Sequence, residues 1–188
     1  AWSPSFILKT LPDGHRMLVA GQKSGMVWGH DPDREGTVAW KTPLVAKLAL
    51  GIIRFGGAAD DQYAYFGVST GGVAAIRIDT GEKKWFTPIA GPSAPGPRGE
   101  GAAITAIPGV IFSGSSEGML RAFATDDGRL LWDYNMIRDY QTVNGVPAKG
   151  GSMGAPGPTV AGGMLFVGSG YIFTAGHTGN ALLVFSAE

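Results

Sequence analysis

Lys23 is the first residue whose type and position could support chemistry. It lies in Gly21-Gln-Lys-Ser-Gly25, between two apolar runs, and this composition predicts a tight turn. A lysine ammonium at a turn can grip an anionic or quinone oxygen, provided that the turn opens onto a binding cavity. The same spacing also fits a solvated turn lysine, which spacing alone favours.

Two serine motifs raise the question of nucleophilic catalysis. Gly67–Gly71 and Gly114–Gly118 both match GxSxG, a pattern that in hydrolases needs a strand before it and a helix after it. Here the β-rich runs Val73–Ile78 and Met119–Ala124 follow instead. We therefore interpret both motifs as hairpin turns and disfavour a hydrolase.

The histidines and paired carboxylates give weaker signals. His15, His30 and His177 do not have the spacing of metal ligands, so structural or surface roles are favoured. The pair Asp60-Asp61 could bind a cation or do acid–base work. It lies directly before a β-rich run, and a turn-forming role is the better prediction.

Composition excludes several function classes. The chain has 188 residues with 15 basic and 15 acidic side chains, and only 16% are charged, which excludes an electrostatic nucleic-acid binder. It has no cysteine, which excludes disulfides, thiol catalysis and iron–sulfur clusters. No apolar run is long enough to predict a transmembrane segment. The N-terminus does not resemble a signal peptide and lacks an initiator methionine, so we expect a processed chain or a piece of a longer one.

A repeat provides the strongest structural signal. Trp40, Trp85 and Trp132 lie 45 and 47 residues apart, and each ends a segment with an apolar strand, an Asp, a Gly-containing turn and a short strand. A second predicted hairpin precedes each of these segments. Four-stranded units at this period are typical of propeller blades, so we predict an all-β fold, a β-propeller of about four blades with four antiparallel strands each.

The predicted organisation is one domain over residues 1–188, either a small propeller or a half-propeller. The fourth unit stops after Phe185, before its expected last strand. A partner could supply the rest, two copies could form eight blades, or Trp2–Leu8 could complete a four-bladed ring. The predicted repeats cover residues 1–45, 46–90, 102–138 and 156–188, with loops at 91–101 and 139–155.

Several stretches resemble one enzyme family. Phe6–Pro32, which contains the Lys23 turn, resembles the middle blades of quinoprotein alcohol dehydrogenases, most nearly the polyvinyl-alcohol-dehydrogenase-like subgroup. Ala103–Ser115, Thr142–Met153 and Gly179–Phe185 are also similar to that subgroup. The resemblance covers nearly the whole chain.

The resemblance implies an eight-bladed propeller that uses pyrroloquinoline quinone (PQQ) and calcium. Lys23 matches the family lysine that contacts the quinone oxygens, where an ammonium polarises the carbonyl that accepts hydride. Asn144, Lys149 and Gly151 match a loop near the cofactor mouth. The implied cofactor-binding residues are therefore Lys23, Asn144 and Lys149, the implied substrate is a small or polymeric alcohol, and the implied location is periplasmic or secreted.

Departures from the family pattern limit what this chain can do alone. The family's catalytic Asp and calcium ligands come from preceding blades and have no counterpart here, and the vicinal cysteines of many members are absent. Phe55-Gly56 stands where a Trp-Gly pair is usual. The chain resembles roughly the C-terminal half of such a propeller, so we expect no alcohol oxidation by the chain alone.

The alternative function is a non-catalytic propeller, a scaffold or binding module. Its partners would bind through the loops at 91–101 and 139–158. An incomplete propeller also predicts a homodimer or a partner protein, because blades bury their faces against one another.

Overall fold

The computed structural model describes residues 2–44, 53–89, 99–172 and 176–187. In these residues the chain forms antiparallel sheets that follow one another along the sequence, together with the 3-10 helix η1 (Pro32–Arg34). The first sheet contains β1 (Trp2–Thr10), β2 (Arg16–Gln22), β3 (Met26–Asp31) and β4 (Thr37–Pro43), and the second contains β5 (Ala58–Ala59), β6 (Tyr63–Val68), β7 (Gly72–Arg77) and β8 (Lys83–Pro88). The third contains β9 (Thr105–Ile107), β10 (Val110–Gly114), β11 (Met119–Ala124) and β12 (Leu130–Asn135), and the fourth contains β15 (Thr159–Ala161), β16 (Met164–Ser169) and β17 (Ala181–Ser186). A hairpin of β13 (Asp139–Tyr140) and β14 (Ala148–Lys149) separates the last two sheets.

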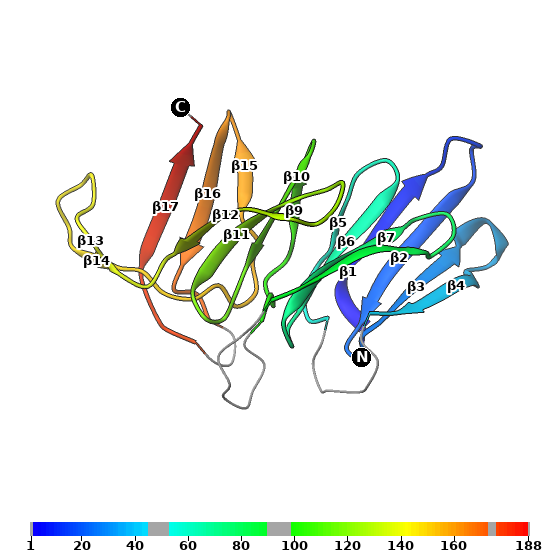
Figure 1. Ribbon diagram of the computed structural model, residues 1–188, viewed down its shortest axis with the longest axis horizontal. Helices are drawn as coiled ribbons and strands as arrows, with labels where there is room; N and C mark the ends of the chain where they lie inside the picture. Colours follow the sequence, from blue (N-terminus) through cyan, green and yellow to red (C-terminus); the bar gives the residue numbers. More distant parts are fainter. Residues whose placement is uncertain (1, 45–52, 90–98, 173–175, 188) are drawn as a thin grey trace.

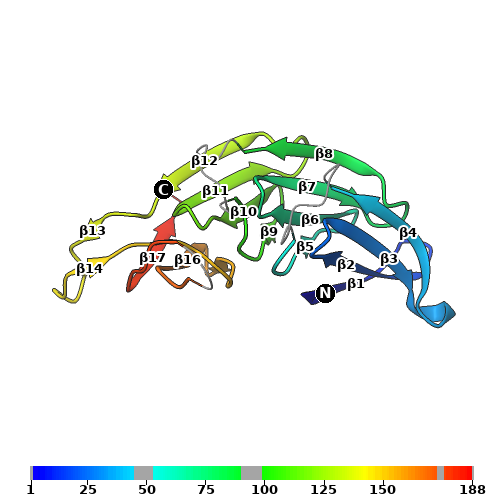
Figure 2. The same ribbon diagram turned by 90° about the horizontal axis from the view of Figure 1, so that it is seen from below.

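The sheets stand side by side along an arc (Figures 1 and 2). In Figure 2, β4, β8 and β12 lie on the outer, convex side, whereas β1, β5 and β9 lie on the inner side. Each sheet is an antiparallel meander whose strands pair in chain order. This is the predicted all-β architecture, a partial propeller whose ring of sheets is not closed.

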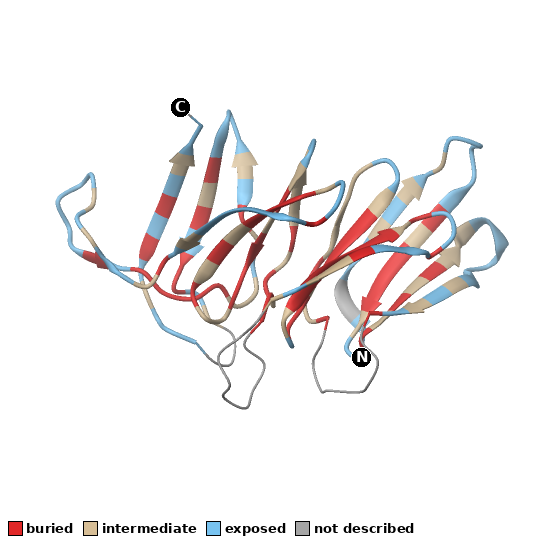
Figure 3. Ribbon diagram, in the orientation of Figure 1, coloured by how far each residue is buried: buried red, intermediate tan, exposed pale blue. Residues whose placement is uncertain are grey.

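Burial concentrates on the middle strands (Figure 3). Consecutive residues of β6 and β7 are buried, including Tyr65, Phe66, Val73 and Ala74, each with no exposed surface. Strands with a sheet on each side bury both of their faces, so their sequences are nearly continuous apolar runs and do not alternate strictly. The core therefore consists of layers between neighbouring sheets.

The repeated tryptophans join each sheet to the next one. The Trp40 ring donates through Nε1 to the Ile78 carbonyl at 3.0 Å, and the Trp85 ring donates to the Thr125 carbonyl at 3.0 Å. Both rings pack over the glycine of the following Asp–Gly turn, where a Cβ on Gly81 or Gly128 would lie 2.5 Å from the indole. The spacing of the tryptophans thus reflects one interaction used twice, from the first sheet to the second and from the second to the third.

Trp132 occupies the corresponding position in the third sheet but is 38% exposed. Its ring contacts Phe185 and Tyr134, with centroids 5.3 and 5.8 Å away. The fourth sheet is described as three strands, so within the described residues no Asp–Gly turn meets this ring.

The suggestion that Trp2–Leu8 completes the fourth sheet is wrong. These residues form most of β1, which pairs with β2 in the first sheet, with Phe6 opposite Ala20 and Leu8 opposite Leu18. Only a short turn separates β1 from β2, so their pairing costs little loop-closure entropy. Ile7 of β1 also packs against the core between the first two sheets. The repeat boundaries and the loop limits given above stay predictions.

No helix in the described part of the chain is long and apolar enough to cross a membrane.

Candidate functional site

The turns between the second and third strands of successive sheets lie on one face of the molecule, at the bottom of Figure 1. They follow β2, β6 and β10, and we call this face the turn face. Corresponding strands of the successive sheets run in the same direction, so the equivalent turns lie at the same end of the molecule. Loops at one end of a propeller or barrel are common places for binding sites.

Lys23 lies in the first of these turns and is exposed. The turn is closed by the Gly25 N–H, which donates to the Gln22 carbonyl at 2.9 Å, and Gly25 has a φ of +82°. The Ser24 hydroxyl donates to Gln22 Oε1 at 2.6 Å. These bonds fix the backbone of the turn and leave the lysine side chain on the turn face.

Residues 150–154 form a strap across the turn face beneath the third and fourth sheets. The Met153 N–H donates to the Ser115 carbonyl at 3.0 Å, in the turn after β10. The Ser152 and Gly154 N–H groups donate to the carbonyls of His177 and Tyr171 at 2.8 and 3.0 Å, in the connection between β16 and β17. The strap therefore links two neighbouring sheets through backbone hydrogen bonds. The close approach of its backbone to theirs leaves no room for a Cβ at Gly150 or Gly151.

Ser152 and Ser169 reinforce the strap from inside. Ser152 has no exposed surface; its hydroxyl donates to the Ser116 carbonyl at 2.7 Å and accepts from the His177 N–H at 2.8 Å. Ser169 Oγ accepts from the Gly151 N–H at 2.8 Å. Ser116 and His177 thus contribute backbone groups to a structural network.

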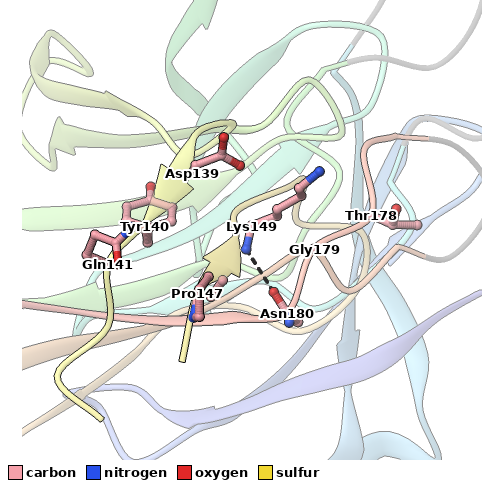
Figure 4. Close-up of a pocket in the computed structure, with 9 residues that line it drawn as sticks. Asp139, Tyr140, Gln141, Pro147, Lys149, Thr178, Gly179 and Asn180 are labelled. Atoms are coloured by element: carbon pink, nitrogen blue, oxygen red, sulfur yellow. Dashed lines mark hydrogen bonds between the residues drawn. The ribbon is translucent and has the colours of Figure 1, made fainter. Parts of the chain in front are cut away.

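An open cavity of about 620 Å³ lies beside the strap, between the β13–β14 hairpin and residues 178–180 (Figure 4). Asp139 and Lys149 face each other across the hairpin as register partners. The backbone of Lys149 is fixed by Asn180, whose Oδ1 accepts from the Lys149 N–H at 2.8 Å and whose N–H donates to the Lys149 carbonyl at 2.8 Å. The cavity is thus lined by one acidic and one basic side chain from facing positions of the hairpin.

Tyr140 closes one side of this cavity. Its hydroxyl donates to the Met136 carbonyl at 3.1 Å. Burial raises the pKa of Tyr140 above its ordinary value, and the neighbouring Tyr134 hydroxyl raises it further. The phenol therefore stays protonated and acts as a hydrogen-bond donor.

The chain matches a protein-family profile over residues 3–108. The family is PQQ_2, described as outer membrane protein assembly factor BamB. The chain belongs to the PQQ_2 family. Within it, the chain is 40% identical to a polyvinylalcohol dehydrogenase of Pseudomonas sp and 38% identical to one of Sphingopyxis sp. strain 113P3. Each alignment covers 97% of this chain, and the chain spans 32% of the length of each relative.

A solved structure agrees with the PQQ_2 fold. The quinohemoprotein alcohol dehydrogenase of Comamonas testosteroni superimposes with a TM-score of 0.63 at 16% identity, over 82% of this chain and 28% of that one. At this identity the likeness supports the fold alone. The family match and the 38–40% identity to polyvinylalcohol dehydrogenases confirm the resemblance that the motifs predicted.

The predicted cofactor residues of this PQQ_2 chain do not form one cluster. Lys23 lies on the first sheet, whereas Lys149 lines the cavity beside the fourth, at the opposite end of the arc (Figure 1). Asn144 lies in the loop between β13 and β14, where its Oδ1 accepts from the Val146 N–H at 3.2 Å and shapes the turn. Their assignment to a cofactor stays a prediction.

Other residues that the sequence singled out have roles in turns. Asp60 Oδ1 accepts from the N–H groups of Gln62 and Tyr63 at 2.8 and 2.7 Å, which confirms its turn-forming role. Both GxSxG motifs lead into strands, as predicted for hairpin turns.

The described residues contain no group of three or more His, Cys, Asp or Glu side chains that could hold a metal ion. Most of the loop at 91–101 lies outside the described residues.

Glu100 is an unusual residue that the sequence motifs did not single out. It has no exposed surface and forms an ion pair with Arg121 of β11. The signal available in the sequence was a single acidic residue between two glycines, Gly99 and Gly101. Its burial depends on the packing of two sheets, which no local pattern specifies.

Proposed function

We propose that this chain is part of a PQQ-dependent alcohol dehydrogenase and forms one wall of its cofactor site. The observation that carries the proposal is the 38–40% identity to polyvinylalcohol dehydrogenases over 97% of the chain. The substrate class is a small or polymeric alcohol. The exposed Lys23 on its ordered turn supplies the group expected at the quinone.

The donor chemistry of the turn face fits PQQ in part. PQQ is an anionic quinone, and the ammonium of Lys23 suits a quinone or carboxylate oxygen. Lys149 provides a second cation beside the cavity, although on another sheet. A single arc of sheets supplies donors from one side only, so further walls of the site belong to another part of the protein or to a partner.

Calcium does not fit the described residues. A calcium ion takes six to eight oxygen ligands, including carboxylates. No group of three acidic or histidine side chains is found in the described ranges, so we derive no step through a metal ion.

Bound PQQ would supply the acceptor for the hydride that leaves the alcohol carbon. Lys23 would hold the quinone by a hydrogen bond from its ammonium, which suits an oxygen that gains negative charge. The hydroxyl proton needs a base, and the resemblance places that base outside this chain. A complete enzyme of this kind would work in the periplasm or outside the cell.

Replacing Lys23 by methionine is expected to weaken binding of PQQ by about tenfold or more, because a charge-assisted hydrogen bond contributes about 1.5–3 kcal/mol. Quenching of tryptophan fluorescence by PQQ measures the dissociation constant. Lys83→Met is the matched control, since Lys83 is an exposed lysine on β8, the outer strand of the second sheet. Equal affinities of the two variants would contradict the role of Lys23.

The purified chain is expected to show no PQQ-dependent oxidation of polyvinyl alcohol, because the base is missing. Reduction of an artificial electron acceptor measures this. Native mass spectrometry with PQQ tells whether the chain binds the quinone as a monomer or as a dimer. Turnover by the pure chain would show that its own residues provide the base.

A second candidate function is a binding module without catalysis. The family description names an assembly factor, and the β13–β14 hairpin exposes the apolar side chains of Val143 and Val146. Exposed apolar side chains on a hairpin tip suit docking to a protein partner. Absence of PQQ binding by the chain would favour this function over the first.

A further inference from the structure

Asn144 is followed by Gly145 at the tip of the β13–β14 hairpin, which projects away from the sheets (Figure 1). Both residues are exposed, and the preceding Val143 is the most exposed large apolar residue of the described chain. A Cβ built on Gly145 would meet no atom within 4 Å, and the φ of this residue is +76°. The peptide bond between Asn144 and Gly145 therefore has open space around it.

An asparagine that precedes a glycine can react with its own main chain. The backbone nitrogen of the glycine attacks the side-chain carbonyl carbon, Cγ. The bond between Cγ and the side-chain nitrogen breaks, ammonia leaves, and a five-membered succinimide ring closes. Water then opens the ring at either of its carbonyl groups, which yields an aspartate or an isoaspartate. Glycine permits this attack best because it has no Cβ to crowd the nitrogen.

The turn at the hairpin tip places hydrogen-bond donors at the oxygen where negative charge develops. The Val146 N–H donates to Asn144 Oδ1 at 3.2 Å, and the Thr142 hydroxyl is in hydrogen-bond contact with the same oxygen. Oδ1 becomes an oxyanion as the nitrogen adds to Cγ, and donors already aimed at it stabilise that charge. The Gly145 N–H donates to the Thr142 carbonyl at 3.0 Å. This bond closes a single exposed turn, and such turns open often, which frees the nitrogen to attack.

The chain contains two other asparagines, Asn135 and Asn180, and neither offers these conditions. Asn135 precedes Met136, which has no exposed surface, and Asn180 precedes Ala181, which is buried at the start of β17. Both following residues pack into the same hydrophobic cluster, so their backbone nitrogens are held away from the asparagine side chain. Among the three asparagines, Asn144 alone combines exposure with a following glycine.

We propose that Asn144 is a site of spontaneous covalent modification, at which the chain converts this residue through a succinimide to aspartate and isoaspartate. The nucleophile is the Gly145 nitrogen, the leaving group is ammonia, and the co-reactant is water. The conversion changes the formal net charge of the chain from zero to minus one.

The modification changes the hairpin tip in two ways. A negative charge appears between Val143 and Val146, the exposed apolar side chains of the tip. Isoaspartate also adds one methylene group to the main chain, which displaces the oxygen that accepts from the Val146 N–H. Both changes make the tip less suited to an apolar partner. This consequence rests on the second candidate function, docking through the hairpin, whereas the modification itself does not depend on it.

Ageing of the purified 188-residue chain at mildly alkaline pH, followed by tryptic peptide mapping, tests the proposal. Cleavage after Arg138 and Lys149 releases a peptide in which Asn144 is the single asparagine. We expect this peptide to gain about 1 Da, the difference between an amide and a carboxyl group, and to separate into two products of equal mass. In water enriched in heavy oxygen, the new carboxyl group should carry the label. The peptides that contain Asn135 and Asn180 are internal controls and should stay unchanged.

Two glycine variants test the role of the turn. Gly145→Ala should slow the conversion by about tenfold or more, because the added Cβ crowds the attacking nitrogen. Gly163→Ala is the matched control and should leave the rate unchanged, since Gly163 has a φ of +77° and equally open surroundings but lies in another hairpin.

Three results would overturn the proposal, and none of them needs a variant to fold. An unconverted Asn144 after several weeks would show that the turn protects the residue. Aspartate as the sole product would show that water attacks the amide directly, without a succinimide. Conversion of Asn135 or Asn180 at the rate of Asn144 would show that the hairpin tip has no special part.

Discussion

Replacing Trp85 by alanine is expected to lower the free energy of unfolding by about 4 kcal/mol. Trp85 is 9% exposed, lies in the core between the second and third sheets and has its ring 6.0 Å from that of Tyr65. The substitution removes this packing and also leaves the Thr125 carbonyl without the indole N–H. Denaturant unfolding followed by far-ultraviolet circular dichroism measures the change.

Two further variants separate the causes. Trp85→Phe keeps an aromatic ring but loses the hydrogen bond, so it should cost less than the alanine variant. Trp132→Ala removes the same residue type from the equivalent position of the third sheet, where the ring is 38% exposed. Its cost should be well below that of Trp85→Ala because less surface is buried, and equal costs would contradict the role assigned to the Trp–Gly contact.

Gly150→Ala is expected to destabilise the chain by about 3 kcal/mol. An added Cβ would lie 1.9 Å from the Met136 carbonyl oxygen, which is backbone and cannot rotate away. The strap would have to move off the third sheet, and its bonds to Ser115 and His177 would weaken. Denaturant unfolding measures the stability, and hydrogen exchange of the Ser152 and Met153 amides reports on the strap.

Gly168→Ala is the matched control for this effect. Neither glycine has a positive φ, so backbone strain plays no part in the comparison. A Cβ on Gly168 meets no atom within 4 Å. The control should change stability by less than about 0.5 kcal/mol. A similar loss of stability in both variants would show that any alanine is costly here, and that the close approach at Gly150 is not the cause.

The fold class and the repeat were predictable from the amino-acid sequence. Strand propensity, Asp–Gly turns and the regular spacing of Trp40, Trp85 and Trp132 are local or periodic features, and each hairpin needs only its own residues to form. The turn that carries Lys23 was predictable for the same reason, since its geometry depends on neighbouring glycine and serine. The family resemblance rested on the same short runs.

The way in which these strands and turns pack together depends on contacts between distant segments. The short turn favours pairing of β1 with β2, but the packing of Ile7 against the core between the first two sheets also contributes, and the sequence of β1 alone does not specify that contact. Lys23 and Lys149 lie apart because one belongs to the first sheet and the other to the hairpin beside the last sheet, and the structural role of Asn144 follows from the loop that surrounds it. Burial of Glu100 against Arg121 arises because two sheets enclose a segment that is polar and glycine-rich in sequence, and burial of this kind depends on packing between distant residues.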